Sequence, residues 1–163
     1  MEKKNYKLII FDADDTLRYC TVKGQPCPNK PGEWELLPNV KAKLAEYDWG
    51  SPLEGKVGYG IASNQGGVGM GYFKAEMAFQ LLRDTFIAAF GYEPKNVVIQ
   101  MCTTKPHVDS INRKPRPGML NTLMAFWRVT PEDTLFVGDM QSDKETALNA
   151  DCDFMWAREF FGF

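Results

Sequence analysis

Four aspartates stand where carboxylate chemistry could be carried out. Asp12 and Asp14 follow an apolar run near the start of the chain, and Asp139 and Asp143 follow a second one near its end. Several carboxylates at one place repel one another unless a cation lies among them. Oxygen ligands favour a hard cation such as Mg²⁺, and no His or Cys accompanies these residues, which argues against Zn²⁺. The aspartates together predict a magnesium site, although Asp143 alone would also fit a helix cap.

The elements that must position these residues can be predicted from the apolar pattern. Strands are expected where apolar residues run together between turn residues, and helices where they recur every three or four positions. The expected strands are 6–11, 57–62, 96–102, 134–137 and, at an edge, 153–157. The expected helices are a short one opened by Pro38, then 73–90, 117–129 and 142–150. Ser142 and Glu145 fit a capping box for the last helix.

Strands and helices alternate along the chain, which predicts an α/β fold with a parallel sheet covered by helices on both faces. Ligands of such sheets bind beyond the carboxyl ends of the strands. Asp12 and Asp14 follow the first expected strand, and Asp139 follows the fourth. Ser63 and Asn64 follow the second. All five side chains should therefore converge on one edge of the sheet.

Length and composition limit the classes of protein to which the chain can belong. The chain has 163 residues, 44% hydrophobic and 25% charged, which fits one globular domain over residues 1–163. A net charge of −2 argues against an extended nucleic-acid-binding surface, so any such contact would be local. No stretch approaches the roughly 20 apolar residues of a membrane span, and no secretory apolar region is visible. A cytoplasmic protein without membrane contact is therefore expected.

Two loops carry most of the turn-forming residues. Residues 18–34 hold three prolines and two glycines, so an irregular segment is expected there. Its cysteines, Cys20 and Cys27, are expected to be free thiols in a reducing compartment. A zinc site is not favoured there, because the short C-x-x-C pairs typical of zinc sites are missing. Residues 64–71, NQGGVGMG, do not fit a known phosphate-binding glycine motif, and a mobile loop near the substrate is expected there.

Four segments resemble the four motifs of the haloacid dehalogenase (HAD) superfamily. The first motif, D-x-D-x-T, resembles residues 11–17, FDADDTL, and the second, in its S/T-N-Q form, resembles residues 61–65, IASNQ. The third, R-K-P-x-P-G-M, resembles residues 113–119, RKPRPGM, and the fourth, G-D-x3-D, resembles residues 138–143, GDMQSD. Their order and spacing also match, and four motifs in order are far more specific than any one alone.

This resemblance implies a Rossmannoid three-layer fold with a minimal cap, here the short flap at about 18–34. The forms of the second and third motifs are similar to one branch, which holds histidinol-phosphate phosphatase, heptose bisphosphate phosphatase and polynucleotide 3′-phosphatase. Residues 36–40, LLPNV, and 71–73, GYF, are similar to its sugar-phosphatase side. The implied protein is a Mg²⁺-dependent phosphomonoester hydrolase that acts on a small phosphorylated metabolite such as a sugar phosphate.

The resemblance also implies a role for each acidic residue. Asp12 would attack phosphorus and form an aspartyl-phosphate. Asp14 would protonate the leaving oxygen and then activate water as a general base. Asp12, the backbone carbonyl of Asp14, and Asp139 would hold the metal. Asp143 would be a further ligand or a support for the others.

The remaining implied roles concern the phosphate. The side chain of Ser63 and the backbone of Asn64 would hold its oxygens. Lys114 would supply a fixed positive charge to the phosphate and to the nucleophile. Arg113 and Arg116 would contact the substrate or, equally well, form a solvated surface.

One departure from this branch concerns zinc. Many histidinol- and heptose-type members carry a zinc loop, C-x-H…C-x-C, just before R-K-P. Here Ser110 and Asn112 stand at the positions of the last two cysteines, and four residues separate Cys102 from His107, where a C-x-H pair has one. No zinc site is therefore expected.

Three alternatives to this function stay open. A polynucleotide 3′-phosphatase could use the basic cluster at 105–116, although the acidic overall charge favours a metabolite. A receiver-like signalling domain would carry its acceptor Asp after the third strand, where residues 101–103 are MCT. A non-catalytic phosphate-binding protein is disfavoured because both Asp12 and Asp14 are present.

Overall fold

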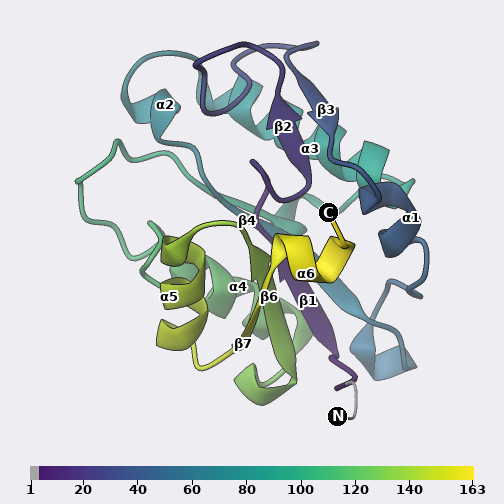
Figure 1. The fold of residues 1–163 in the computed structure, drawn as a ribbon. Helices are drawn as coiled ribbons and strands as arrows, with labels where there is room; N and C mark the ends of the chain where they lie inside the picture. The colour runs from purple at the N-terminus through teal and green to yellow at the C-terminus, as the bar shows by residue number, and fades with distance from the viewer. Residues whose placement is uncertain (1–3) are drawn as a thin grey trace.

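The computed structural model describes residues 4–163, which are built around a five-stranded parallel sheet (Figure 1). Its strands are β1 Leu8–Phe11, β4 Gly58–Asn64, β5 Ile99–Cys102, β6 Thr134–Gly138 and β7 Asp153–Trp156. Their spatial order is β5-β4-β1-β6-β7, and each neighbouring pair is parallel. A strand lies at each of the five expected runs, so the predicted α/β fold is confirmed. The expected strand 96–102 is shorter than predicted, because residues 96–98 form a turn of 3₁₀ helix before β5.

The register of the central strands determines where the site lies. Phe11, the last residue of β1, is opposite Ile61 in β4 and Val137 in β6. Since the three strands run in parallel, the residues at their carboxyl ends share one edge of the sheet. This is the edge at which the sequence placed the acidic residues. Strand β4 continues to Asn64, so Ser63 and Asn64 lie within the strand that they were predicted to follow, because both pair with β5.

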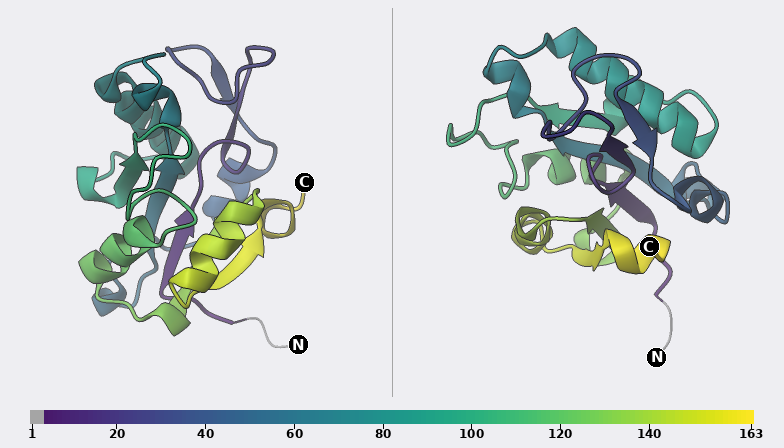
Figure 2. Two further views of the ribbon diagram at one scale, coloured as in Figure 1. Left: turned by 90° about the vertical axis from the view of Figure 1, so that its left-hand side faces the viewer. Right: turned by 45° about the horizontal axis from the view of Figure 1, so that its top comes forward.

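Helices pack against the sheet from both sides (Figure 2). Their bounds are α1 Val40–Leu44, α2 Gly66–Gly69, α3 Ala75–Phe90, α4 Gly118–Trp127, α5 Gln141–Asn149 and α6 Ala157–Phe161. One-turn 3₁₀ helices lie at Pro52–Glu54, Asn96–Val98 and Pro131–Asp133. Helix α3 packs on α1 and β5, α4 packs on β1, β4 and β5, and α5 packs on β6 and β7. In the right-hand view of Figure 2, α3 lies above the strands and α5 below them.

Strand β4 is close to α4 because it carries glycines on that face. A Cβ atom at Gly60 would lie 2.8 Å from Leu123 Cδ2, and one at Gly58 would lie 3.0 Å from the Trp127 ring. These contacts are tighter than those of ordinary Cβ atoms, so a larger residue at either position would require Leu123 or Trp127 to shift. The Trp127 indole also donates a 2.8 Å hydrogen bond to the carbonyl of Tyr59.

The opposite face of the sheet is covered by aromatic side chains. The Phe11 ring has its centroid 6.0 Å from Phe90 of α3, 5.4 Å from Phe160 and 5.9 Å from Phe161 of α6. Such edge-to-face and tilted pairs add attraction beyond simple burial. The C-terminal aromatics therefore fold back onto the body of the protein, as expected, and they do so from a helix.

The flap is more regular than predicted. Residues 18–20 form strand β2, which pairs antiparallel with β3 Trp34–Leu36 in a separate two-stranded sheet. The proline-rich middle is irregular, but the Thr21 N–H donates to the Glu33 carbonyl at 2.8 Å and continues the pairing. The expectation of an irregular segment was wrong for its first residues, because prolines disfavour strands only where they stand. The glycine-rich segment likewise contains the short helix α2.

The N-cap of helix α5 is Met140, two residues before the predicted Ser142, and the helix begins at Gln141. Ser142 and Glu145 therefore do not form the predicted capping box. The carboxylate of Asp143 accepts from the N–H groups of Asp139 and Met140, both at 3.1 Å. It thereby satisfies backbone donors that the start of a helix leaves without partners.

Residues 4–163 contain no helix that is both long and apolar enough to cross a membrane. The sequence analysis expects no secretory segment at the start of the chain. Residues 1–3 of that region lie outside the described residues.

Candidate active site

Three side chains meet in a buried ion-pair cluster at the carboxyl edge of the sheet. The ammonium of Lys114 donates to Asp12 Oδ1 at 2.8 Å, to Asp143 Oδ1 at 2.7 Å and to the carbonyl of Ala62 at 3.2 Å. Asp12 is 6% exposed, Lys114 7% and Asp143 1%. A buried charge persists only where partners and hydrogen bonds compensate it, and all three ammonium donors are used here.

The close approach of Asp143 depends on Gly138, the last residue of β6. A Cβ atom at Gly138 would lie 2.5 Å from Asp143 Cβ and 2.6 Å from its carboxyl carbon. With one oxygen bonded to Lys114 and the other to two backbone N–H groups, the Asp143 carboxylate has a partner at each oxygen.

Asp12 and Asp139, by contrast, retain oxygens that have few donors. The Thr16 hydroxyl lies 3.3 Å from Asp12 Oδ2 and 3.3 Å from Asp139 Oδ1, and its single hydrogen can serve only one of them. One oxygen from each of Asp12, Asp139 and Asp143 lies within 4.8 Å of the other two. The possible ligands are all oxygen atoms, and few hydrogen-bond donors compete for those of Asp12 and Asp139. Such a set fits a hard cation such as Mg²⁺.

The site holds three carboxyl groups, those of Asp12, Asp139 and Asp143, but one ammonium group, that of Lys114. Burial raises the pKa of the Asp12 carboxyl well above its ordinary value; Lys114 lowers that pKa, and Asp143 and Asp139 raise it. Burial also raises the pKa of Asp139. For Lys114, burial lowers the pKa, but the charges of Asp12 and Asp143 outweigh it and the net direction is upward. A cation among the carboxylates would favour their ionised forms.

Asp14 points away from this cluster and into a second set of contacts. Its Oδ1 accepts from Arg18 Nε at 2.8 Å, and its Oδ2 accepts from Gln65 Nε2 at 3.1 Å. Gln65 Nε2 also donates to Ser63 Oγ at 2.8 Å. The amide thus links the residue expected to be the general acid to the one expected to bind phosphate.

Asn64 holds the Lys114 loop in place through its side chain. Its Oδ1 accepts from the Lys114 backbone N–H at 3.1 Å, and its Nδ2 donates to the Lys114 carbonyl at 3.4 Å. The second motif therefore positions the third, in addition to the expected role of its backbone.

Arg113 and Arg116 lie farther out, on the loop before α4. Arg113 donates to the carbonyl of Thr104 at 2.7 Å, and Arg116 forms a two-fold contact with Asp109 at 3.0 and 2.8 Å. Together with Lys114 and His107 they line a hollow of about 380 Å³. The structure therefore brings both arginines beside the site without bonding them to its acidic residues.

The sequence analysis gave no role to two buried side chains of the site. Arg18 was counted as the start of an irregular flap, yet it is fully buried against Asp14. Its spacing of four residues from Asp14 was the one available signal. Gln65 was quoted only as part of a motif, but it is 1% exposed and contacts both Asp14 and Ser63.

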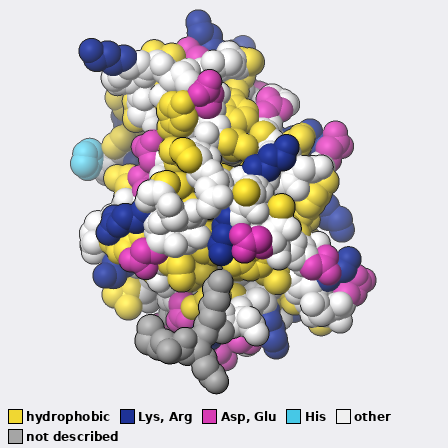
Figure 3. Space-filling view, turned by 45° about the vertical axis from the view of Figure 1, so that its right-hand side comes forward, with side chains coloured by type: hydrophobic (Ala, Val, Ile, Leu, Met, Phe, Trp, Pro, Cys, Tyr) yellow, Lys and Arg dark blue, Asp and Glu magenta, His cyan; other side chains and the backbone are white. Residues whose placement is uncertain are grey.

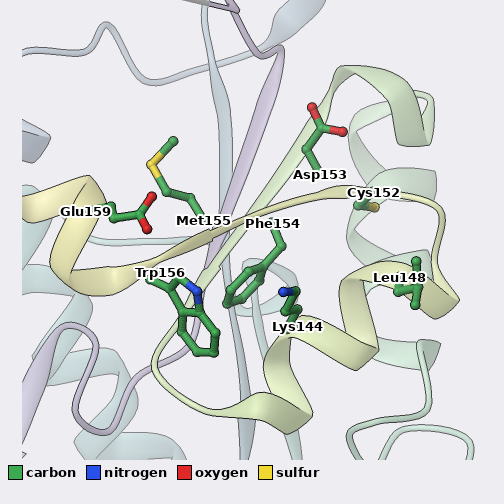
Figure 4. A pocket seen from close by; sticks show the side chains of 8 residues that line it. All are labelled: Lys144, Leu148, Cys152, Asp153, Phe154, Met155, Trp156 and Glu159. Atoms are coloured by element: carbon green, nitrogen blue, oxygen red, sulfur yellow. The ribbon is translucent and has the colours of Figure 1, made fainter.

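A larger hollow lies elsewhere. It has a volume of about 500 Å³ and is lined by side chains of α5, β7 and α6, including Lys144, Phe154 and Trp156 (Figure 4). None of the expected site residues lines it.

The surface charges are mixed on the face that Figure 3 shows. Lys and Arg side chains are interspersed there with Asp and Glu, and they form no basic stripe of the kind that tracks a nucleic-acid backbone.

The fold and the acidic edge define a phosphatase of the HAD superfamily. The model of the family described as polynucleotide kinase 3 phosphatase matches residues 7–161, and the chain belongs to this family. The predicted superfamily and the predicted phosphatase class are thus confirmed.

Several relatives share a narrower description. The D-glycero-beta-D-manno-heptose-1,7-bisphosphate 7-phosphatase of Pseudomonas putida is 29% identical over 147 residues, 87% of this chain and 77% of the relative. The enzyme of the same name from Bordetella bronchiseptica is 29% identical over 150 residues, 90% of this chain and 77% of the relative. The crystal structure of D,D-heptose 1,7-bisphosphate phosphatase from B. bronchiseptica, complexed with magnesium and phosphate, superposes with a TM-score of 0.72 at 25% identity, covering 91% of this chain and 78% of that one.

Proposed function

We propose that this phosphatase hydrolyses a phosphorylated sugar, with Mg²⁺ as cofactor and Asp12 as nucleophile. The observation that carries the proposal is the placement of Asp12. Its buried carboxylate stands at the end of the central strand, bonded to Lys114 through one oxygen, with the other oxygen beside Thr16 and near Asp139.

The metal would be held by Asp12 and Asp139 together with the Asp14 backbone carbonyl, because the single hydroxyl hydrogen of Thr16 cannot serve both Asp12 Oδ2 and Asp139 Oδ1. Asp143 would act as a support, because Lys114 and two backbone N–H groups already use its oxygens. Mg²⁺ bound there would offset the negative charge of the carboxylates and of the phosphate. Two carboxylates with open positions are typical of magnesium sites that also take substrate phosphate.

In the first step, a carboxylate oxygen of Asp12 attacks phosphorus, and the bond from phosphorus to the leaving oxygen breaks. Lys114 keeps Asp12 oriented and supplies positive charge to the phosphoryl group. Asp14, in its protonated form, gives its proton to the leaving oxygen, so that the sugar departs as a neutral alcohol.

In the second step, water attacks phosphorus of the aspartyl-phosphate while Asp14 takes a proton from it. The bond between phosphorus and the Asp12 oxygen then breaks, which releases inorganic phosphate and restores the carboxylate. Ser63 and the Asn64 backbone would hold the phosphate oxygens through both steps.

The relatives and the surface support a small substrate. The relatives described above are heptose-1,7-bisphosphate 7-phosphatases. The hollow lined by Arg113, Lys114 and Arg116 would suit a second anionic group beyond the reacting phosphate.

Phosphate release with Mg²⁺ and with EDTA tests this proposal. The substrates are heptose 1,7-bisphosphate, histidinol phosphate, common sugar phosphates and a 3′-phosphorylated oligonucleotide. We expect Mg²⁺-dependent release from a sugar phosphate. Release from the oligonucleotide alone would assign the protein to nucleic-acid ends, and no release from any compound would contradict the proposal.

A further inference from the structure

Arg18 is fully buried, and it is the largest of the completely buried side chains. Its one carboxylate partner among the described residues is Asp14, which accepts from Nε at 2.8 Å. Nη2 approaches the second oxygen of the same carboxylate at 3.5 Å. A buried guanidinium is costly without such compensation, so its place at Asp14 calls for an explanation beyond packing.

The far side of the guanidinium is anchored on α3. Nη1 donates to the carbonyl of Leu81 at 3.0 Å and to Thr85 Oγ1 at 2.9 Å. Thr85 is itself fully buried and donates to the Leu81 carbonyl at 2.8 Å. The α3 helix thus fixes the guanidinium, and the guanidinium fixes the carboxylate.

The backbone strengthens this connection. The N–H of Asp15 donates to the carbonyl of Arg18 at 2.7 Å, so the two ends of the segment 14–18 are tied together. Gln65 contacts Asp14 from the other side at 3.1 Å. A carboxylate held from two sides by three donors has one preferred orientation.

We infer that Arg18 is a positioning residue, which orients the Asp14 side chain for proton transfer and transmits that orientation from α3. The inference rests on the proposed function, in which Asp14 exchanges protons with the leaving group and with water. It predicts that loss of Arg18 harms the steps that need Asp14 and spares the attack of Asp12 on phosphorus.

Leaving groups of different acidity separate these two effects. An alkoxide such as a sugar oxygen needs a proton as it leaves, whereas nitrophenolate leaves without one. Single-turnover release of nitrophenolate, with enzyme in excess over nitrophenyl phosphate, therefore reports the attack of Asp12 alone. Turnover of a sugar phosphate reports proton transfer as well.

The variants are Arg18→Met, Arg18→Lys and Thr85→Val, with Arg83→Met as the matched control. Arg83 lies on the same helix and pairs at 3.4 Å with the exposed Glu93. For Arg18→Met we expect kcat on the sugar phosphate to fall by about 30–100-fold. We expect KM and nitrophenolate release to stay within about 3-fold of wild type, because substrate binding and attack do not need Arg18.

Arg18→Lys keeps the charge but loses the two-pronged geometry, so it should lie between wild type and Arg18→Met. Thr85→Val leaves Arg18 in place and removes one anchor, so it tests the inference even if Arg18→Met does not fold. We expect about a 3–10-fold loss in sugar-phosphate kcat for Thr85→Val, again without loss of nitrophenolate release. Arg83→Met should match wild type in both assays.

Two outcomes would overturn the inference. A parallel loss in both assays for Thr85→Val and the Arg18 variants would indicate a role in folding only. Unchanged kcat on the sugar phosphate would show that Asp14 needs no such support. Failure of the proposed function is a separate result, because wild-type protein would then release no phosphate from any substrate with Mg²⁺.

Discussion

Lys114 Nζ donates a 2.8 Å hydrogen bond to Asp12 Oδ1 across 102 residues of sequence, and both side chains are buried. The bond joins the end of the central strand to the loop that precedes α4. The side chain of Asn64 fixes that loop by bonding to the Lys114 backbone. Three motifs that are far apart in the chain thus define the position of one carboxylate.

Replacing Lys114 with Met should reduce both stability and activity. It leaves Asp12 and Asp143 buried without their shared partner, which is expected to cost about 3–5 kcal/mol of unfolding free energy in EDTA. The kcat should fall by at least about 100-fold. Denaturant unfolding and phosphate release measure the two effects, and the exposed Lys105→Met in the same loop is the control. Unchanged stability in EDTA would speak against the described cluster.

Mg²⁺ should stabilise the protein more strongly as the pH rises. The pKa of Asp12 and of Asp139 is raised in the metal-free protein, so protons compete for these carboxylates up to a higher pH than for ordinary aspartates. In the absence of metal, the contribution of these two carboxyl groups to folding stability changes with pH in the opposite direction. A carboxyl whose pKa rises on folding stabilises the fold while protonated, and this contribution is lost as the pH rises through the raised value.

Thermal unfolding with saturating Mg²⁺ and with EDTA measures this linkage. The increase in Tm caused by Mg²⁺ should be larger at about pH 7.5 than at about pH 5.5, since stabilisation by a bound ligand grows with the logarithm of the ratio of its concentration to Kd. An equal increase at both values would mean that neither carboxyl takes part in binding.

Asp143→Asn should remove hydrogen bonds from the site without exposing residue 143 to solvent. An amide cannot accept at both of its ends, so it loses either the Lys114 bond or the bonds from the Asp139 and Met140 N–H groups. We expect about a 10–100-fold loss of Mg²⁺ affinity or kcat, as for other supports of metal ligands. The neighbouring Ser142→Ala should have no effect. Mg²⁺ titrations of kcat that coincide for all three proteins would refute this role.

Much of this site could be predicted from sequence because residue type and strand ends determine it. Asp12 and Asp139 each follow a buried strand, and Ser63 lies at the carboxyl end of another, so the parallel topology alone brings them together. Arg18 could not be predicted in the same way, since only the packing of α3 over the flap shows that it is buried. The start of α5 was missed because Asp143 caps it, a role that competed with the Ser142 pattern.

The purified protein should contain no stoichiometric zinc. The loop at 102–116, in which Ser110 and Asn112 stand at two positions of the zinc motif C-x-H…C-x-C, is held by the Arg116–Asp109 ion pair and by the Arg113 bond to the Thr104 carbonyl at 2.7 Å. Elemental analysis after metal-free purification measures this directly. One zinc per chain would overturn this account of the loop, and Cys102 and His107 would be the first residues to replace.

The most direct test of the central claim is chemical trapping of the phosphoenzyme. Wild-type protein and Asp12→Asn are mixed with substrate and Mg²⁺, quenched in acid within the first turnover, digested and analysed by mass spectrometry. The exposed Asp15→Asn is the matched control. We predict one phosphoryl group on the peptide that contains Asp12, in wild type and in Asp15→Asn, and neither label nor turnover in Asp12→Asn. Turnover by a correctly folded Asp12→Asn, or a label on another residue, would contradict the assignment of Asp12 as nucleophile.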